Sequence, residues 1–245
     1  MSLGTMPPPA SVRGRDARDR ILRAALANFG RDGFALATTR RIARDAHVSL
    51  PAIKYYFENK EGLYLACARE IVERYRSEIG EFVLSVVDDL DRGLTADGAR
   101  QHLKELMRRV IALTDAGDAG DDGDADLRTA FVLREMTDQG PAFELLYRRL
   151  WQPGVRLTAT LIARIEGKAE PDRKAHIRAL MLHASLTTFS ATRPVSVRYL
   201  GVGPTPHPWR EGTDAALTVI DEQIDQLGAA GNLTNGRRCS PPAIT

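Results

Sequence analysis

Several residues and patterns that define major protein classes are scarce in this sequence. It holds 2 cysteines among 245 residues, Cys67 and Cys239, which are too few for a disulfide framework. No apolar run approaches the roughly 20 residues that span a membrane, and the N-terminus lacks the apolar core of a signal peptide. These absences predict a cytoplasmic protein with no membrane partner.

The motifs of common catalytic and metal sites are also missing. No His-Glu-x-x-His, paired-cysteine, Walker or nucleophile-elbow pattern is present. The aspartate-rich run from Asp115 to Asp126 resembles a calcium loop, but a loop starting at Asp118 would have Gly120 where an acid belongs and Thr129 at the bidentate glutamate position. We therefore predict a flexible acidic linker there, no metal, no cofactor and no enzymatic activity.

Positive charge is concentrated near the N-terminus. The whole chain carries a net charge of +2, whereas the segment from Arg13 to Gly62 carries +5, so the remainder carries −3. A basic head on a mildly acidic body indicates a polyanionic partner at one end of the molecule.

Apolar residues recur every three or four positions along nearly the whole chain, which is typical of amphipathic helices. The first helix is expected to end near Gly30 to Gly33, and Asn59 is expected to cap a long helix that continues to about Leu90. We predict an all-α fold of about nine helices. The other expected helices are residues 39–46, 50–56, 98–114, 125–138, 141–167 with a kink at Pro153 and Gly154, 172–192 and 211–227.

Two hydroxyl residues precede short apolar clusters in TTRRIARDAHVSLPAIKYYFENK, residues 38–60. Thr38 is expected to cap one helix and Ser49 the next, because each hydroxyl can accept a hydrogen bond from a backbone N–H of the first helical turn. Ala46-His47-Val48 is left between them for a turn, so the two helices must cross steeply. The stretch predicts a helix-turn-helix that binds double-stranded DNA.

The second of these helices is expected to enter the major groove and present its first residues to base edges. Lys60, near a helix N-terminus, is expected to bind a phosphate together with the helix dipole. Arg40 can instead be a solvated charge, and Tyr56 can be a core residue. The residues predicted to contact DNA are Thr39, Arg40, Ser49, Leu50, Pro51, Ala52, Lys54, Tyr55, Tyr56 and Lys60.

A known family shares this arrangement of hydroxyls, turn and aromatics. The motif Thr39-x-Arg41-Ile42-Ala43-x-x-Ala46-x-Val48-Ser49, followed by Tyr56-Phe57-x-x-Lys60-x-x-Leu63, resembles the N-terminal domain of TetR/AcrR-type transcriptional regulators over residues 16–65. The rest more weakly resembles the subgroup with a CerR-like ligand domain, through Arg134-Glu135 and the helix from Leu182 to Phe189. The resemblance implies a homodimer that binds an operator with its N-terminal domains and a small molecule with its C-terminal domains.

Three residues depart from the family pattern. His47 stands in the turn where the family usually has glycine, Pro51 replaces a frequent glycine, and Lys54 sits where many members carry tyrosine. Histidine tolerates a positive φ better than most residues, and proline loses no hydrogen bond in the first turn of a helix. The fold is therefore expected to persist.

Four segments are expected in chain order. They are a disordered N-terminal arm (1–15), a helix-turn-helix DNA-binding domain of three helices (16–62), a larger helical ligand-binding and dimerisation domain (63–228) and a disordered tail (229–245). The most favoured function is a repressor that a small molecule releases from its operator. An architectural DNA-binding protein without an effector and a helical enzyme with a DNA-binding head are the alternatives.

Two sets of residues in the larger domain are candidates for its functions. Aromatic, methionine and polar side chains at helical spacing predict an apolar pocket, although the same pattern is common in a core. Apolar residues on two late helices predict a two-fold four-helix interface. The pocket set is Met107, Phe131, Arg134, Tyr147, Trp151, His183 and Phe189, and the interface set is Ile177, Leu180, Ala184, Leu217, Ile220 and Ile224.

Overall fold

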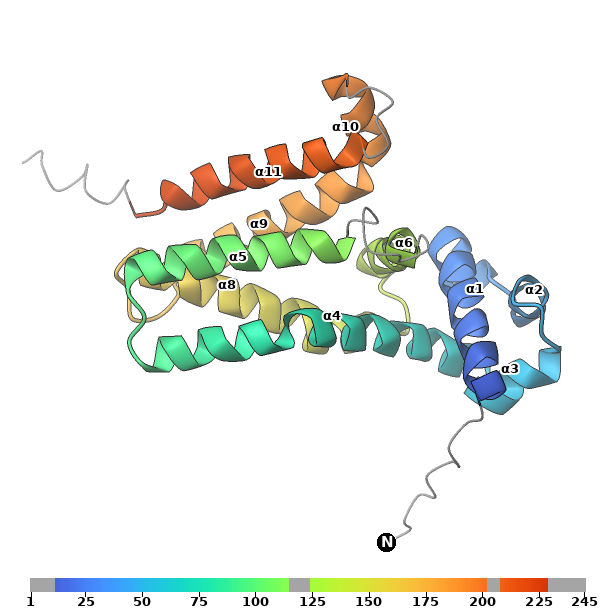
Figure 1. Ribbon diagram of the computed structural model, residues 1–245. Helices are drawn as coiled ribbons and strands as arrows, with labels where there is room; N and C mark the ends of the chain where they lie inside the picture. The colour runs from blue at the N-terminus through green and yellow to red at the C-terminus, as the bar shows by residue number, and fades with distance from the viewer. Residues whose placement is uncertain (1–11, 115–123, 202–207, 229–245) are drawn as a thin grey trace, which may run out of the picture. The chain divides into compact units, whose positions relative to one another are not determined.

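The computed structural model describes residues 12–114, 124–201 and 208–228 (Figure 1). Within these ranges the chain is helical apart from short turns and bends, and it contains no strand. The predicted all-α fold is therefore confirmed. The helices are α1 (Val12–Leu36), α2 (Thr39–Asp45), α3 (Leu50–Phe57), α4 (Lys60–Asp91), α5 (Ala96–Thr114), α6 (Asp124–Asp138), α7 (Phe143–Leu146), the π-helical segment η1 (Tyr147–Trp151), α8 (Gln152–Ile165), α9 (Arg173–Ala191), α10 (Arg193–Leu200) and α11 (Pro208–Asp225).

Two compact units divide the chain. Unit 1 combines Met1–Arg74 with Asp121–Tyr147, and unit 2 combines Tyr75–Gly120 with Arg148–Thr245. The helix α4 therefore contributes its first turns to unit 1 and its remainder to unit 2. Unit 1 is larger than the domain expected at residues 16–62, because α6 and α7 also belong to it.

Aromatic side chains form the centre of unit 1. The Tyr64 ring lies edge-on to Phe29, with ring centroids 4.7 Å apart, and its centroid is also 4.7 Å from that of Phe131. Phe34 meets the same tyrosine at 5.0 Å. These residues come from α1, α4 and α6, so burial of their large apolar surfaces holds the three helices together. The helix α2 packs against α1, and α3 packs against α2.

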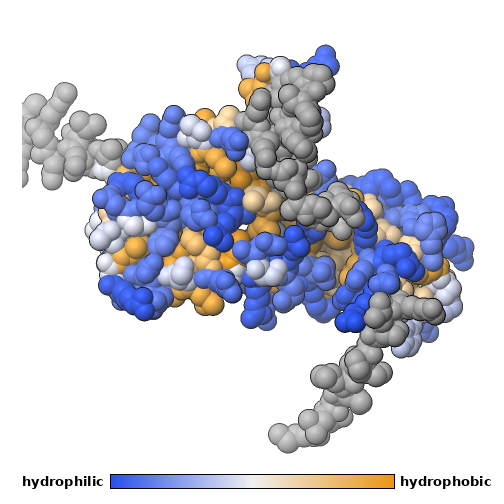
Figure 2. All heavy atoms as spheres, viewed as in Figure 1, coloured by the Kyte–Doolittle hydropathy of each residue, from blue (hydrophilic) through white to orange (hydrophobic). Residues whose placement is uncertain are grey.

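The core of unit 2 lies among α5, α8, α9 and α11, which pack on one another. Met107, Leu103 and Ile162 are fully buried there, and the late helix α11 adds Ile220 and Ile224. Figure 2 shows a largely hydrophilic surface on the face that it draws, with hydrophobic patches over the helices of unit 2. The described residues contain no helix long and apolar enough to cross a membrane.

The first helix breaks within the region where its sequence predicts an end. Its backbone leaves the helical conformation at Gly33, where φ is 74°, which agrees with the expected end near Gly30 to Gly33, and a short second helical stretch continues to Leu36. Gly30 stays inside the helix, and a Cβ there would lie 3.0 Å from the Cβ of Ala130. This glycine therefore serves the close approach of α1 and α6 rather than the end of a helix.

The helix expected at residues 141–167 is interrupted by the π-helical segment Tyr147–Trp151, which ends two residues before Pro153. The irregularity therefore begins upstream of the kink predicted at Pro153 and Gly154 and lies next to it. Pro153 lies in the first turn of α8, where its missing N–H leaves no helical hydrogen bond unmade. Pro194 occupies the same position in α10, a short helix that the sequence did not predict.

Three further expectations concern residues at or beyond the limits of the described ranges. The tail 229–245 lies outside them, as do residues 115–123 of the acidic run, whereas the end of that run, 124–126, is not a linker because it forms the start of α6. The predicted arm 1–15 lies outside only up to residue 11, because α1 already begins at Val12.

Candidate nucleic-acid interface

The helix α2 begins as its sequence predicts. Thr38 has extended backbone angles, φ −121° and ψ 140°, and its hydroxyl accepts a hydrogen bond from the Arg41 N–H at 3.3 Å. The helix buries Ile42 and Ala43. The predicted N-cap is therefore confirmed, and it leaves the polar side of α2 outside, with Arg40 exposed and Thr39 half-buried.

Polar contacts fix α2 on α1. Arg41 lies 3.0 Å from an Asp32 carboxylate oxygen, and the Asn28 side-chain amide donates to Asp45 at 3.0 Å. Asn28 is buried, and its hydrogen bond, followed by that of Arg44, holds the pKa of the Asp45 carboxyl below its usual range. The ionised aspartate thus links the two helices at neutral pH.

The turn between α2 and α3 contains one residue in the left-handed backbone conformation. His47 has a φ of 52°, and the Val48 N–H that follows donates to the Ala43 carbonyl at 3.0 Å. This is the position at which the resembled family usually has glycine. The histidine therefore adopts the strained conformation that glycine would adopt at little cost.

Substitutions at His47 should follow this backbone requirement. We expect His47→Val to lower the free energy of unfolding by about 1–2 kcal/mol, since a β-branched residue tolerates a positive φ poorly. His47→Gly should retain wild-type stability or exceed it. Urea unfolding followed by circular dichroism measures both, and equal losses for the two variants would show that the imidazole, not the backbone, decides stability at this position.

The start of α3 differs from expectation. Ser49 has N-cap backbone angles, but its hydroxyl makes no capping hydrogen bond, so the predicted side-chain cap is wrong. The Ser49 carbonyl instead accepts from the Ala52 N–H at 3.0 Å, and Pro51 has no N–H that needs a partner. The exposed Ser49 hydroxyl is left accessible.

One face of α3 is anchored and the other is open. Ile53 and Phe57 are buried at 2% and 6% exposure. The side chains that point away from this buried face form the open face of α3, where Tyr55 is 78% exposed. The helix thus displays an apolar edge followed by a cation and a phenol, groups that can contact thymine methyls, base edges and phosphates. The open face consists of Leu50, Pro51, Lys54 and Tyr55, while Ala52 and Tyr56 are half-buried beside it.

A tight turn joins α3 to α4. Glu58 has a φ of 66°, and the Asn59 side chain accepts from the Gly62 N–H at 2.8 Å, which confirms the predicted cap of the long helix. The Lys60 ammonium donates to the Ala35 carbonyl at 3.1 Å and lies 4.7 Å from the centre of the Phe34 ring. Lys60 therefore ties the start of α4 to the last turn of α1, a role that its sequence position did not reveal.

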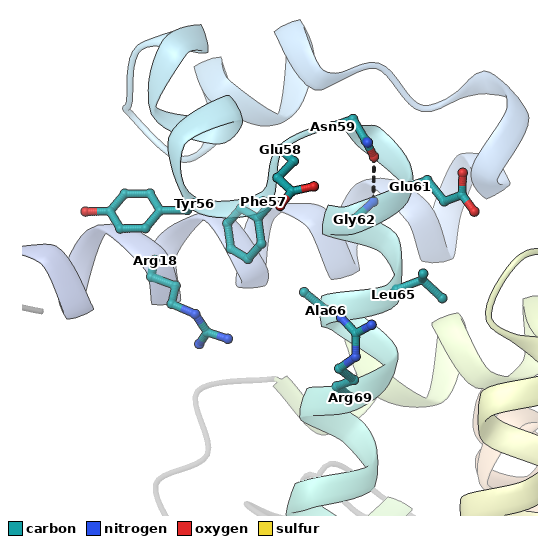
Figure 3. A pocket seen from close by; sticks show the side chains of 10 residues that line it. All are labelled: Arg18, Tyr56, Phe57, Glu58, Asn59, Glu61, Gly62, Leu65, Ala66 and Arg69. Atoms are coloured by element: carbon teal, nitrogen blue, oxygen red, sulfur yellow. Dashed lines mark hydrogen bonds between the residues drawn. The ribbon is translucent and has the colours of Figure 1, made fainter. Parts of the chain in front are cut away.

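A hollow of about 500 Å³ lies beside the end of α3 (Figure 3). Arg18 of α1 and Arg69 of α4 border it, and the Arg18 guanidinium lies 5.8 Å from the centre of the Phe57 ring. Glu58 and Glu61 line it as well, so its charges balance. The hollow is therefore no concentrated anion site.

The residues predicted to line a ligand pocket are divided between the two units. Phe131 and Arg134 lie in unit 1, where Phe131 is fully buried and Arg134 donates to the Arg31 carbonyl at 2.8 Å. Tyr147, also in unit 1, stacks on Phe143. Those in unit 2 are Met107, which is fully buried in the core, and the partly buried Trp151, His183 and Phe189.

His183 has the most specific contacts of this set. Its Nε2 lies 2.9 Å from the Thr158 hydroxyl oxygen, which joins α9 to α8. Burial lowers the pKa of the imidazole, so the ring is neutral at pH 7. A neutral imidazole bonded to a hydroxyl can serve either as a structural link or as a polar group of a ligand site.

The residues predicted for a dimer interface also fall into two groups. Ile177 and Leu180 on α9 are 47% and 54% exposed, and Ala184 is exposed one turn further on. Ile220 and Ile224 are instead buried in the core of unit 2, with Leu217 partly buried against it, and for the two isoleucines the prediction is wrong. Their stripe on α11 covers the subunit's own core, which a helical period alone cannot distinguish from an interface.

The sequence interpretation missed a buried polar pair in unit 1. The Tyr64 hydroxyl donates to Glu135 Oε1 at 2.5 Å, and Glu135 is 0% exposed. A signal was present, because Glu135 follows the buried Phe131 by four positions and so shares its helix face. An acid on the apolar face of a helix indicates a buried carboxyl.

Comparisons with known proteins identify the family. Residues 21–67 match the tetR family of bacterial regulatory proteins, and residues 99–222 match the C-terminal domain of the HTH-type transcriptional dual regulator CecR. The chain belongs to the TetR family of transcriptional regulators and carries a CecR-like C-terminal domain, which is the domain that the CerR-like resemblance indicated. The family match therefore makes it a transcriptional regulator.

Particular relatives agree with this assignment. The dual regulator CecR of Shigella flexneri is 32% identical over 151 residues, which are 60% of this chain and 63% of that protein. The chain thus spans less than two thirds of this relative's length. A TetR-like regulator from Rhodococcus sp. RHA1 has a TM-score of 0.60 at 19% identity, over 92% of this chain and 100% of that one. A regulator from Saccharomonospora viridis, solved in complex with choline, has a TM-score of 0.53 at 19% identity, over 85% and 96%. These two structures share the fold.

Proposed function

We propose that this regulator is a repressor that binds its operator as a homodimer and leaves it when a small molecule binds. The observation that carries the proposal is the open face of α3, whose neighbouring core residues Ile53 and Phe57 fix the helix in place. In helix-turn-helix proteins the second helix lies in the major groove with its early residues against the bases. Lys54 and Tyr55 are then the specificity residues, and Thr39, Arg40 and Tyr56 contact the backbone.

Small-molecule release is supported by the size and chemistry of unit 2. A protein of this fold was solved in complex with choline. In this chain Trp151, His183 and Phe189 are only partly buried, so we propose them for the effector site. Because the relative in Shigella flexneri is named a dual regulator, activation at some promoters is a second candidate function.

The test is binding of the full chain to duplexes selected from a random pool, with and without a panel of small molecules. A repressor of this type selects a two-fold symmetric site with half-sites about 34–36 Å apart or somewhat more. An effector that weakens operator binding must itself bind less tightly to the DNA complex by the same factor, roughly 5- to 150-fold. Unselective binding to all duplexes would support an architectural role instead.

The dimer is proposed to form through the exposed face of α9. Ile177, Leu180 and Met181 are 47%, 54% and 67% exposed, and Leu180 and Met181 follow Ile177 by three and four positions, so the three side chains form one apolar patch. We expect Leu180→Glu to give a monomer by light scattering at micromolar concentration, where the wild type is a dimer, because the new charge would be buried in the interface. Met136→Glu, at a 41% exposed position on α6, is the control and should leave the dimer intact. A monomeric wild type would contradict the proposal.

A further inference from the structure

A buried carboxyl group in unit 1 lies outside the DNA-contacting surface. Glu135 is 0% exposed, and its Oε1 accepts the 2.5 Å hydrogen bond from Tyr64. Its Oε2 is buried and finds no hydrogen-bond partner within the described residues. An unpaired polar atom in a core costs free energy, and a negative charge there costs more. The neutral acid is therefore the form that suits this position.

The turn after α6 encloses this carboxyl. A Cβ at Gly140 would lie 2.4 Å from Glu135 Oε1, so a larger residue there would displace the carboxyl from its present position. Gln139, which begins the turn, has a φ of 48°, and its N–H donates to the Glu135 carbonyl at 3.0 Å. Tyr64 closes the other side from α4. A positive φ at a residue other than glycine and a glycine in contact with the acid indicate a specific enclosure.

The surroundings of Glu135 on α4 and α6 on balance raise its pKa and so favour the neutral form of the carboxyl. Burial is the largest influence on the pKa of Glu135 and raises it, whereas the hydrogen bond from Tyr64 and the backbone N–H groups of Ala142 and Gly140 lower it. The Asp138 carboxylate raises this pKa, and the net shift is upward. On α4, burial raises the pKa values of Tyr64 and Cys67, so both stay uncharged at neutral pH. Arg134 does not offset this, because its guanidinium is directed to the Arg31 carbonyl of α1 and to Asp138.

Tyr64 connects the carboxyl to the DNA-binding helices. It lies one turn after Lys60, which contacts the end of α1, and two residues after Gly62, which packs on the end of α3. We propose that protonated Glu135 is a positioning residue that holds the first turns of α4 in the arrangement that binds operator DNA. The inference rests on the proposed operator binding. When the carboxyl ionises, conformers in which it reaches water increase in population, and the arrangement that binds the operator decreases.

The proposal fixes the direction of the pH dependence. The enclosed carboxyl keeps its proton to a higher pH than a glutamate that reaches water, so the binding arrangement is fully favoured below the ordinary glutamate pKa. It then loses population as the pH rises toward the raised pKa of Glu135. Within this window, operator affinity falls by up to about tenfold per pH unit for each subunit.

The experiment compares full-length wild type with Glu135→Gln on one selected duplex from pH 4.5 to 8.5 by fluorescence anisotropy. Gln keeps the acceptor for Tyr64 but has no proton to lose. The two should bind within about twofold at pH 4.5, while Glu135→Gln should bind about tenfold more tightly at pH 8.5. Tyr64→Phe, which removes the donor that favours the carboxylate, should lose more affinity over the same range than the wild type.

Controls separate this inference from the proposed function. Glu144→Gln, at an exposed position on α7, should follow the wild-type profile. Parallel profiles for wild type and Glu135→Gln, with specific binding retained, would overturn the role of Glu135 and leave the proposed function standing. A wild type that selects no duplex would overturn both. If Glu135→Gln fails to fold, the profile of Tyr64→Phe decides, and one parallel to wild type counts against the proposal.

Discussion

Replacing Gly62 with alanine is expected to lower the free energy of unfolding by about 2–3 kcal/mol, because the site has no room for a methyl group. A Cβ at this position would lie 2.2 Å from the Phe57 carbonyl oxygen, which is a backbone atom and cannot rotate away. The end of α3 or the start of α4 would have to move. Since Phe57 anchors α3, the substitution should also weaken operator binding.

Gly80 provides the matched control in the same helix. A Cβ there would meet the Arg76 Cγ at 3.7 Å, which is an ordinary contact. Gly80→Ala should therefore raise stability by about 1 kcal/mol, the usual gain for alanine over glycine inside a helix. Thermal and urea unfolding followed by circular dichroism should move in opposite directions for the two variants. A shift of the same sign in both would mean that helix propensity, and not the contact with Phe57, governs position 62.

Substituting both Lys54 and Tyr55 with alanine should remove most of the selectivity for the operator. A good base contact is worth about 1–3 kcal/mol, or roughly 5- to 150-fold in affinity, and both side chains are exposed on α3. Neither is needed for the core, so folding should be unaffected. Binding to the selected duplex and to a scrambled duplex of the same length should converge in the double variant. Lys174→Ala, an exposed lysine on α9 in unit 2, should leave both affinities unchanged.

Lys60→Ala distinguishes two roles for that residue. If Lys60 also binds a phosphate, affinity for every duplex falls, and the slope of log affinity against log salt decreases by about one for each phosphate that the variant no longer neutralises. If it only joins α4 to the Ala35 carbonyl, stability falls while the slope stays the same. Measuring the slope and the unfolding midpoint on one preparation separates the two.

The local features of the DNA-binding helices could be predicted because short-range rules decide them. Thr38 caps α2, Asn59 caps α4, and Ile53 and Phe57 face the core at the expected spacing. Ser49 did not follow the rule. The Ala52 N–H already donates to the Ser49 carbonyl, and Pro51 has no N–H, so fewer backbone donors of the first turn need a side-chain acceptor. A favoured residue type indicates a cap position without guaranteeing its hydrogen bond.

Features that depend on contacts distant in sequence could not be predicted. Ile177 and Ile220 both lie on apolar stripes, yet one is exposed and the other is buried, because helix packing decides which stripe meets the core. Gly30 looked like a helix end until the close approach of Ala130 was known. The pairing of Tyr64 with Glu135 spans 71 residues and depends on the packing of three helices.

The discontinuity of unit 1 bears on how the protein folds as it is synthesised. Tyr64 is made early, but Glu135 and Phe131, which complete its surroundings, follow only after all of α5. Closing so long an intervening segment carries an entropic cost and slows folding relative to contacts between neighbouring helices. The DNA-binding unit, although N-terminal, cannot finish folding before part of unit 2 has left the ribosome. Nascent chains that end within α5 would therefore expose the aromatic surface of Phe29 and Tyr64, which is a site for chaperone binding or aggregation.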